Sequence, residues 1–445
     1  MSIAELGPLG FDGGQGVFNG VPEGATLTIE PGVKIYLHEN ATFAVNGVLN
    51  AVGAPDNMIT FTHANCFEHW GNLYFTGEQA SESTLEYVRI QYSDDGVKGE
   101  NAFPHRIANS IIRKVGIYGL KIALREGDHQ GIEVVGNTIS QGAGVGISID
   151  LGPGATIPQI TVRENELSNF YNAGVIIGAD EDLTTTPQVV VEHNVFENGF
   201  RGIGGGFSAV GNVKYRHNYN SNSVSGSGVQ VFWPDNEIMH NFFENTFESA
   251  YQLHSARLTD IHGRANTVFS YNTIKKAPIE SNLGDPDTVV ENNNFYPDPD
   301  SVFWAWGLDK QSGLVADMSN NWWGTASVEE IRRHIIDGKR SPKYADSYME
   351  LLIEPVLTGP NGFGFVRGKV VDSDTGLPLS RALMKGEGFE VRTNVVGGLF
   401  ASMLEGVNTL TVELEGYGTG EFAVEIVAAE VSSAELLMKH PDEGS

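Results

Sequence analysis

Amide, aromatic and acidic residues recur between residues 230 and 306 at a spacing that suits the binding of a sugar chain. Gln230 is followed 22 residues later by Gln252, and Glu280 comes 28 residues after that. Flat aromatic rings stack on the C–H faces of sugars, while amide and acid groups pair with sugar hydroxyls. The candidate substrate-binding residues are Gln230, Phe232, Trp233, Gln252, Trp304 and Trp306.

The same stretch holds residues that could act on a sugar chain. His254, Arg257 and Glu280 supply an imidazole, a guanidinium and a carboxylate. A polysaccharide lyase needs a base to abstract the proton next to a uronate carboxylate and a cation to hold that carboxylate. A glycoside hydrolase needs paired carboxylates instead, and the sequence offers no clear aspartate pair on neighbouring repeats. His254, Arg257 and Glu280 are therefore the candidate catalytic residues, and the question of enzymatic activity stays open.

Metal-ligating residue types occur in two further places. His63, Cys66 and His69 are evenly spaced, but three residues in a segment of turn-like composition favour a turn over a metal site. Four aspartates close to prolines also favour turns, although a Ca²⁺ site is the one cofactor that they suggest. These aspartates are Asp285, Asp287, Asp298 and Asp300.

A repeated phrase between residues 107 and 323 must position these side chains. Each copy has apolar residues, an Asn, one spacer and another apolar residue, and nine such Asn residues follow one another at steps of 28, 28, 29, 24, 23, 31, 21 and 28. Short β-branched runs with this period indicate a solenoid of β-strands, whose equivalent residues lie in columns about 4.8 Å apart. We expect each Asn to adopt a left-handed turn and to pass hydrogen bonds along its column. The nine are Asn109, Asn137, Asn165, Asn194, Asn218, Asn241, Asn272, Asn293 and Asn321.

The residue that precedes the Asn forms a column of its own. Three successive copies have His at this place, which could suggest a shared metal, but a straight column offers poor convergence for one ion. We therefore expect a polar row of turns in contact with solvent. Its members are Glu164, His193, His217, His240 and Tyr271.

The motif Asn320-Asn-Trp-Trp-Gly324, together with the Asn repeat and Glu30-Pro-Gly-Val-Lys34, resembles the right-handed parallel β-helix superfamily that includes pectate lyases. The resemblance implies an all-β right-handed parallel β-helix over residues 25–357, after a lead of residues 1–24. It implies little about function, because that superfamily contains lyases, hydrolases, epimerases, adhesins and fibres. Ser327 and Glu330 form a capping box, which predicts a short helix near residues 327–337 that covers the end of the coil.

A separate unit is expected over residues 363–440, after a linker at residues 358–362. Its short alternating runs with Gly turns predict an antiparallel β-sandwich. The matches at Gly368-Lys-Val, Gly376-Leu-Pro-Leu and Glu415-Gly-Tyr resemble the carboxypeptidase regulatory-like family, which has a transthyretin-like fold. That resemblance implies a non-catalytic spacer or docking module.

Charge limits the partners that the chain can have. The 56 acidic residues outnumber the 28 basic ones, which gives a net charge of -28. Nucleic acid and anionic membranes need a basic face, and no apolar run is long enough to insert into a membrane. The composition favours an extracellular or cell-surface protein whose partner is a polysaccharide. The alternatives are a polysaccharide lyase or glycoside hydrolase, and a structural fibre or adhesin module that assembles with itself or with surface proteins.

Overall fold

The computed structural model describes residues 17–440, apart from thirteen gaps. The gaps are 64–67, 180–187, 200–202, 206–211, 222–226, 232–235, 245–248, 255–266, 277–279, 283–288, 297–302, 306–314 and 337–349. The backbone alone is described at 17–19, 179, 203–205, 227–231, 249–254, 280–282, 303–305, 316 and 336.

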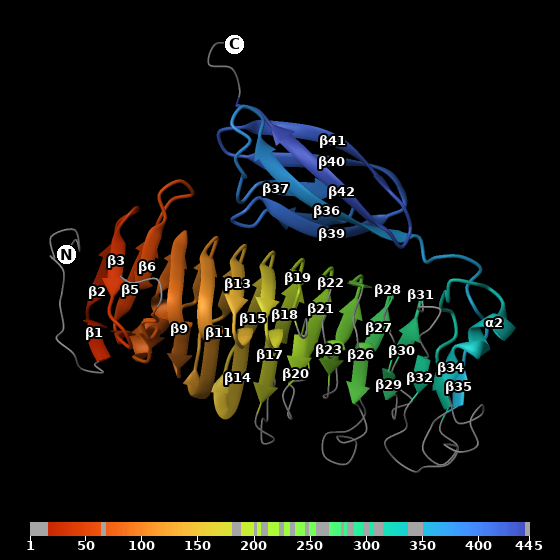
Figure 1. Cartoon of the computed structure of the whole chain (residues 1–445), viewed down its shortest axis with the longest axis horizontal. Coiled ribbons are helices and arrows are strands. Elements are labelled where there is room, and N and C mark those ends of the chain that lie inside the picture. Colours follow the sequence, from red (N-terminus) through yellow and green to blue (C-terminus); the bar gives the residue numbers. More distant parts are fainter. Residues whose placement is uncertain are drawn as a thin grey trace.

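The chain winds into a parallel β-solenoid, which confirms the predicted fold class (Figure 1). One side of the solenoid is an 11-stranded parallel sheet, here called the flat sheet. Its strands are β2 (Thr26–Ile29), β5 (Val48–Val52), β8 (Thr84–Glu86), β10 (Arg106–Ala108), β12 (Ile132–Val135), β15 (Gln159–Arg163), β18 (Gln188–Glu192), β21 (Val213–Arg216), β24 (Glu237–Met239), β27 (Val268–Ser270) and β30 (Val289–Glu291).

The other two sides belong to one 22-stranded sheet, because β9 (Val88–Glu100) and β11 (Ile111–Asp128) run through both. The first strip comprises the early halves of β9 and β11 with β3 (Lys34–Leu37), β6 (Ile59–His63), β13 (Thr138–Gly142), β16 (Glu166–Phe170), β19 (Val195–Glu197), β22 (Tyr219–Ser221), β25 (Phe242–Glu244), β28 (Thr273–Lys275) and β31 (Asn294–Tyr296). The second strip comprises their late halves with β1 (Val17–Val21), β4 (Thr42–Val45), β7 (Leu73–Phe75), β14 (Val145–Thr156), β17 (Ala173–Ala179), β20 (Ile203–Gly205), β23 (Ser227–Val231), β26 (Ser249–His254), β29 (Glu280–Asn282), β32 (Phe303–Ala305) and β34 (Ile335–Ile336).

Alternation of residues along each strand builds the core of the solenoid. Leu120 and Ile122 on β11 are fully buried, and Lys121 between them is half-exposed. Successive side chains of a strand point to opposite faces of a sheet, so buried and half-exposed positions form separate columns along the coil. Isoleucine, valine and leucine fill the buried columns, with Phe61 and Trp70 near the start.

A ladder of buried Asn side chains joins the turns of the coil from Asn137 to Asn321. The Oδ1 of Asn218 accepts hydrogen bonds from both the backbone N–H and the Nδ2 of Asn194, at 2.9 and 3.0 Å. Its Nδ2 donates to the carbonyl of Val191 at 2.8 Å and to Asn241 Oδ1 at 3.2 Å. The predicted column of hydrogen-bonded Asn residues is therefore present.

Two details of the predicted ladder are wrong. Asn109 does not belong to it, because Ser110 occupies that level and its backbone N–H donates to Asn137 Oδ1 at 2.9 Å. The left-handed turn is adopted by the preceding residue and not by the ladder Asn, as at His193 (φ 56°) and His217 (φ 53°). His tolerates the left-handed region of backbone angles better than most residues do. Each ladder Asn can therefore direct its side-chain hydrogen bonds along the axis of the solenoid.

A short cap closes the far end of the coil. Helix α2 (Val328–Arg333) starts at Ser327, whose side chain accepts from the Glu330 backbone N–H at 3.3 Å, as the capping box predicts. The helix is shorter than the predicted 327–337, because Ile335 and Ile336 form β34 and pair with Phe303 and Trp304 of β32. A further parallel pair, β33 (Val315–Asp317) with β35 (Glu350–Leu352), lies at this end, and η2 (Glu78–Glu82) lies near the other.

We predict that Ser327→Ala lowers the stability of this cap by about 1 kcal/mol, because an N-cap hydroxyl satisfies an otherwise unpaired helix N–H. Hydrogen exchange of the α2 amides measures the change. Ser319→Ala, outside the helix, serves as the control. Equal α2 exchange in the Ser327 variant and the wild type would remove the capping role.

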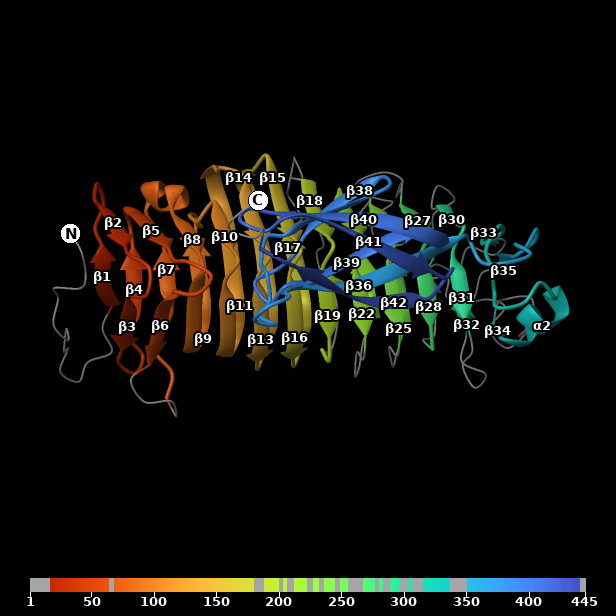
Figure 2. The ribbon, with the colours of Figure 1, turned by 90° about the horizontal axis from the view of Figure 1, so that it is seen from above.

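Seven strands form the C-terminal sandwich. Its three-stranded sheet contains β39 (Gly398–Leu404), β36 (Phe363–Asp372) and β42 (Val431–Met438), and its four-stranded sheet contains β38 (Phe389–Arg392), β37 (Leu383–Gly386), β40 (Gly406–Leu414) and β41 (Gly418–Ile426). The predicted sandwich is present with antiparallel sheets, although β36 and β42 pair in parallel. Met384, Val412 and Leu436 are part of a core separate from that of the solenoid. Figures 1 and 2 show the sandwich lying lengthwise over the solenoid.

Candidate functional site

A continuous row of outward positions follows the second strip. Tyr74 on β7 pairs with Lys98 on β9, which pairs with Lys121 on β11. Each of these three side chains is half-exposed beside fully buried neighbours, so all three face away from the core. The pairing continues through Ser148 on β14 and Ile176 on β17 to Gly204 on β20. We call these positions the outer row.

Later strands extend the outer row to the residues singled out from the sequence. The backbone of Gln230 pairs with that of Gln252, Gln252 pairs with Glu280, and Glu280 pairs with Trp304. At about 4.8 Å per strand, ten strands from Tyr74 to Trp304 span roughly 43 Å. Figure 1 shows β14, β17, β20, β23, β26, β29 and β32 on the side of the solenoid turned away from the sandwich.

The start of the outer row carries an interlocked group of polar side chains. Tyr74 donates its hydroxyl to Glu100 Oε2 at 2.7 Å, and Lys98 Nζ lies 2.9 Å from Glu100 Oε1. The same Nζ lies 5.2 Å from the centre of the Tyr74 ring. This cation–π contact and the shared carboxylate hold the ammonium group at the surface.

The next strand repeats the arrangement. Lys121 Nζ lies 4.9 Å from the centre of the Tyr118 ring. Asp95 Oδ1 accepts from the Tyr118 backbone N–H at 3.2 Å, and burial raises the pKa of this carboxyl. Two ammonium groups thus stand on adjacent strands, each over a tyrosine ring.

The titration of this group favours binding over proton abstraction. Hydrogen bonding to Glu100 raises the pKa of Lys98, and burial together with Glu100 raises that of Tyr74. Both groups therefore stay protonated at neutral pH and can donate to an anion or a hydroxyl. A general base needs a pKa near the working pH, and neither group moves in that direction.

The candidate catalytic residues are only partly placed. His254 lies on β26 and pairs in the backbone with Asn282, two positions along from the pair of Gln252 and Glu280. Arg257, Phe232, Trp233 and Trp306 lie outside the described residues, as do Cys66 and the four aspartates considered for calcium. The described residues include no group of three His, Cys, Asp or Glu side chains that could hold a metal ion. Among them, no helix is both long and apolar enough to cross a membrane.

The comparisons with known proteins are sparse. No protein-family model matches the chain, and no curated protein matches it. Among solved structures, the chain is similar to an alginate lyase from Paenibacillus sp. str. FPU-7, with 16% sequence identity and a TM-score of 0.23. The match covers 68% of this chain and 92% of the alginate lyase chain. At this TM-score, the likeness has no bearing on activity or substrate.

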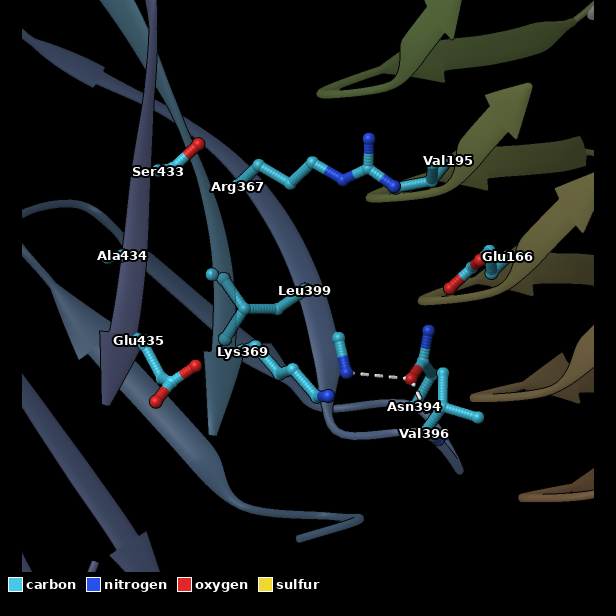
Figure 3. Close-up of a pocket in the computed structure, with 12 residues that line it drawn as sticks. Glu166, Val195, Arg367, Lys369, Asn394, Val396, Leu399, Ser433, Ala434 and Glu435 are labelled. Atoms are coloured by element: carbon cyan, nitrogen blue, oxygen red, sulfur yellow. Dashed lines mark hydrogen bonds between the residues drawn. The ribbon is translucent and has the colours of Figure 1, made fainter. Parts of the chain in front are cut away.

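An open pocket of about 650 Å³ lies between the solenoid and the sandwich (Figure 3). Glu166 reaches it from the solenoid, and Arg367, Lys369 and Asn394 reach it from the sandwich. Burial raises the pKa of Glu166. Arg367 is already bonded to both carboxylate oxygens of Glu197, at 2.6 and 2.9 Å, and Asn394 Oδ1 accepts from Gly398 N at 2.8 Å. Arg367 therefore joins the sandwich to the solenoid, and the bond between Asn394 and Gly398 braces a turn within the sandwich.

The predicted solvent contact of the His row is wrong, because the sandwich covers it. His193 is buried, and its Nδ1 lies 3.0 Å from the carbonyl oxygen of Phe400. His217 Nδ1 lies 2.8 Å from Ser402 Oγ. Nothing in the repeat itself shows this docking, since the covering strands lie about 200 residues further along the chain.

Sequence reasoning also missed the basic start of the outer row. Residues 88–125 contain seven Lys and Arg against three Asp and Glu, and three of the seven, Lys98, Lys121 and Arg125, lie in the late halves of β9 and β11 that form the second strip. This local excess was visible in the sequence. The alternation of Lys121 between Leu120 and Ile122 would have assigned its ammonium group to the outer face.

Proposed function

We propose that this protein binds polysaccharide along the outer row, with a preference for anionic chains at the end near Tyr74. The observation that carries the proposal is the backbone register, which continues one row of positions from Tyr74, Lys98 and Lys121 to Gln230, Gln252, Glu280 and Trp304. A long, regularly spaced surface suits a polymer of repeated units. An extracellular or cell-surface location, which the acidic composition fits, is part of the proposal.

Local charge supports an anionic ligand. In a chain of net charge -28, a polyanion would be repelled from most of the surface and drawn to a basic segment. Lys98 and Lys121 supply ammonium donors on adjacent strands, and the rings of Tyr74 and Tyr118 beside them offer faces for sugar C–H groups. Arg125, held by Asp150 at 2.7 Å, adds a third cation near the end of β11. Glu100, Asp95 and Asp150 lie beside these three cations, so the proposed preference depends on the ammonium and guanidinium donors and not on a net positive charge.

We propose binding rather than catalysis at this end of the row because Lys98 and Tyr74 stay protonated at neutral pH and cannot act as a base. A lyase or hydrolase would have to draw its base from the part of the row near His254 and Glu280. Their strands β26 and β29 are neighbours, so the two residues are close enough in the fold for a lyase or hydrolase to remain the alternative function.

The double variant Lys98→Gln/Lys121→Gln should bind a polyuronate roughly tenfold or more weakly at low salt. It removes two charge-assisted contacts, each worth about 1.5–3 kcal/mol when fully made. Isothermal titration against polyuronate and a neutral glucan measures the change. Raising the salt concentration should weaken wild-type binding to the polyuronate and shrink the difference, because salt screens exposed charges.

Lys214→Gln/Lys385→Gln is the matched control, since both lysines are half-exposed and each pairs with one glutamate. Unchanged polyuronate affinity in the Lys98/Lys121 variant would remove the anionic preference. Failure of the wild type to bind any glycan would remove the proposed function altogether and leave a structural module.

A further inference from the structure

Three imidazole rings form a stack at the seam between the two units. His193, His217 and His240 each precede a ladder Asn, with φ values of 56°, 53° and 56°. Successive ring centres lie 4.8 and 5.1 Å apart with nearly parallel planes, and the Tyr271 ring follows at 5.1 Å. Their spacing follows from the rung spacing, so protonation would place like charges about 5 Å apart.

The sandwich contacts this stack with one face of β36 and β39. Phe400 and Ser402 meet His193 and His217 through hydrogen bonds. The ring of Phe363 lies 4.6 Å from that of His240 in an edge arrangement. His240 Nδ1 is buried and has no hydrogen-bond partner among the described residues. The seam is therefore built for neutral rings.

The seam has an apolar part beside the stack. Val195, Tyr219 and Phe242 on the first strip pack against Phe365 and Phe400, which are both fully buried. The Phe242 and Phe365 rings lie 5.1 Å apart, and the Tyr219 and Phe400 rings 5.3 Å apart. Separation of the units would expose this apolar cluster.

Charged groups lie around the stack, and two of their buried atoms, Arg163 Nε and Glu164 Oε2, have no hydrogen-bond partner among the described residues. On the solenoid, Glu192 pairs with Arg216 at 2.8 Å, and Arg163 adds a further positive charge near His193. Glu164 accepts from the Arg392 backbone N–H of the sandwich at 2.7 Å, and burial raises the pKa of its carboxyl. Among the described residues, three ion pairs cross the seam outside the stack: Arg367 with Glu197, Lys275 with Glu430, and Arg381 with Glu86. A proton gained by the stack therefore meets Arg163 and Arg216, together with Glu192, which Arg216 already pairs, and Glu164, whose burial disfavours a negative charge.

We propose that the His193, His217 and His240 stack is an acid-sensitive latch that holds the sandwich on the solenoid at neutral pH and releases it on acidification. This goes beyond the proposed glycan binding, because the latch lies on a different side of the solenoid from the outer row. Release leaves the linker intact, so the two units remain in one chain.

The direction of the pH dependence follows from the pKa shifts. Burial lowers the pKa of all three imidazoles, with the neighbouring imidazoles adding to the shift at His217 and Arg216 adding to it at His240, whose pKa falls to about 4. A histidine released from the seam returns towards its ordinary value of 6.5. At the imidazoles the docked form then binds fewer protons, so their contribution to docking is complete above about pH 6.5 and is lost as the pH falls towards 4. Glu164 and Glu166, whose pKa burial raises, act in the opposite direction, and the latch requires the three imidazoles to outweigh them. For His240 alone, release at pH 5 would be favoured by about 20-fold relative to neutral pH.

Hydrogen exchange of the full chain from pH 7.5 to 4.5, corrected for the intrinsic rate at each pH, tests the latch. The wild type should lose protection in β39 and β22 by at least tenfold near pH 5 while the amides of the Asn ladder stay protected. The variant His217→Asn/His240→Phe keeps a small polar group and an aromatic ring at the two positions but removes two titrating groups. Its loss of protection should move to lower pH.

His129→Asn is the control, because burial also lowers the pKa of His129, which lies on the solenoid with its Nε2 bonded to the carbonyl of Glu126. In the His129→Asn variant, the seam should lose its hydrogen-exchange protection at the same pH as in the wild type. Three results would overturn the latch: an unchanged seam in the wild type down to pH 4.5, opening of the double variant at the wild-type pH, or simultaneous loss of seam and ladder protection.

Discussion

Replacing Asn218 with Ala should lower the free energy of unfolding by about 3–5 kcal/mol. The substitution leaves the backbone N–H and Nδ2 of Asn194 without their acceptor and the Val191 carbonyl without its donor. Asn218 and Asn194 are fully buried, so water cannot replace these bonds, and each unsatisfied group costs about 1–3 kcal/mol. Urea denaturation followed by circular dichroism measures the loss.

Two further variants serve as comparisons for the loss of stability in Asn218→Ala. Asn218→Ser should fall between Ala and the wild type, because Ser110 shows that a hydroxyl can occupy a ladder level, where it accepts from Val88 N at 3.0 Å. Asn50→Ala, on the flat sheet and half-buried, should change stability by no more than about 0.5 kcal/mol. Similar losses for Asn50→Ala and Asn218→Ala would contradict the role given to the ladder.

Replacing Phe400 with Ala should weaken docking of the sandwich by about 3–5 kcal/mol, the usual cost of truncating a buried Phe. Phe400 is fully buried, yet its ring packs on Tyr219 of the solenoid and Phe365 of the seam rather than in the sandwich core. We expect β22 and β25 to exchange their amide hydrogens faster in this variant. The sandwich should keep its own melting transition.

Met403→Ala is the matched comparison, because Met403 lies on the same strand but in the core of the sandwich. It should lower the stability of the sandwich itself. The contrast follows from the alternation of β39, whose Leu399, Ala401 and Met403 face inward. A Phe400 variant that destabilises the sandwich as Met403→Ala does, with no change at β22, would refute the assignment of Phe400 to the seam.

The regular part of the fold could be predicted from the sequence because its determinants repeat. An Asn before an apolar residue recurs at steps of 21 to 31 residues, and only stacked rungs use such a column. The place of Ser110 in the ladder was not predicted, because a serine makes the ladder hydrogen bonds there and the neighbouring Asn109 matched the repeat. The positions of the left-handed turns were not predicted, because Glu164, His193 and Tyr271 share no residue type that marks this conformation.

The seam could not be predicted because it depends on two outward faces that meet only after both units have folded. Phe365 and Phe400 look like ordinary core residues of a sandwich, and the His row looks like a solvated turn when each repeat is considered alone. Along the outer row, the steps between Gln230, Gln252, Glu280 and Trp304 follow the repeat and could be anticipated. Tyr74 and Lys98 precede the repeated phrase of residues 107–323, and Lys121 lies between its first two copies, so a search for the Asn positions alone does not identify them.

A crystal structure of the chain with a bound oligouronate is the most direct test of the proposed function. We predict a sugar chain across the strands of the second strip, with carboxylates within hydrogen-bond distance of Lys98 Nζ and Lys121 Nζ and a sugar face against Tyr74 or Tyr118. An oligosaccharide bound on the flat sheet, on the sandwich or in the pocket at the seam, with the outer row left empty, would contradict the account.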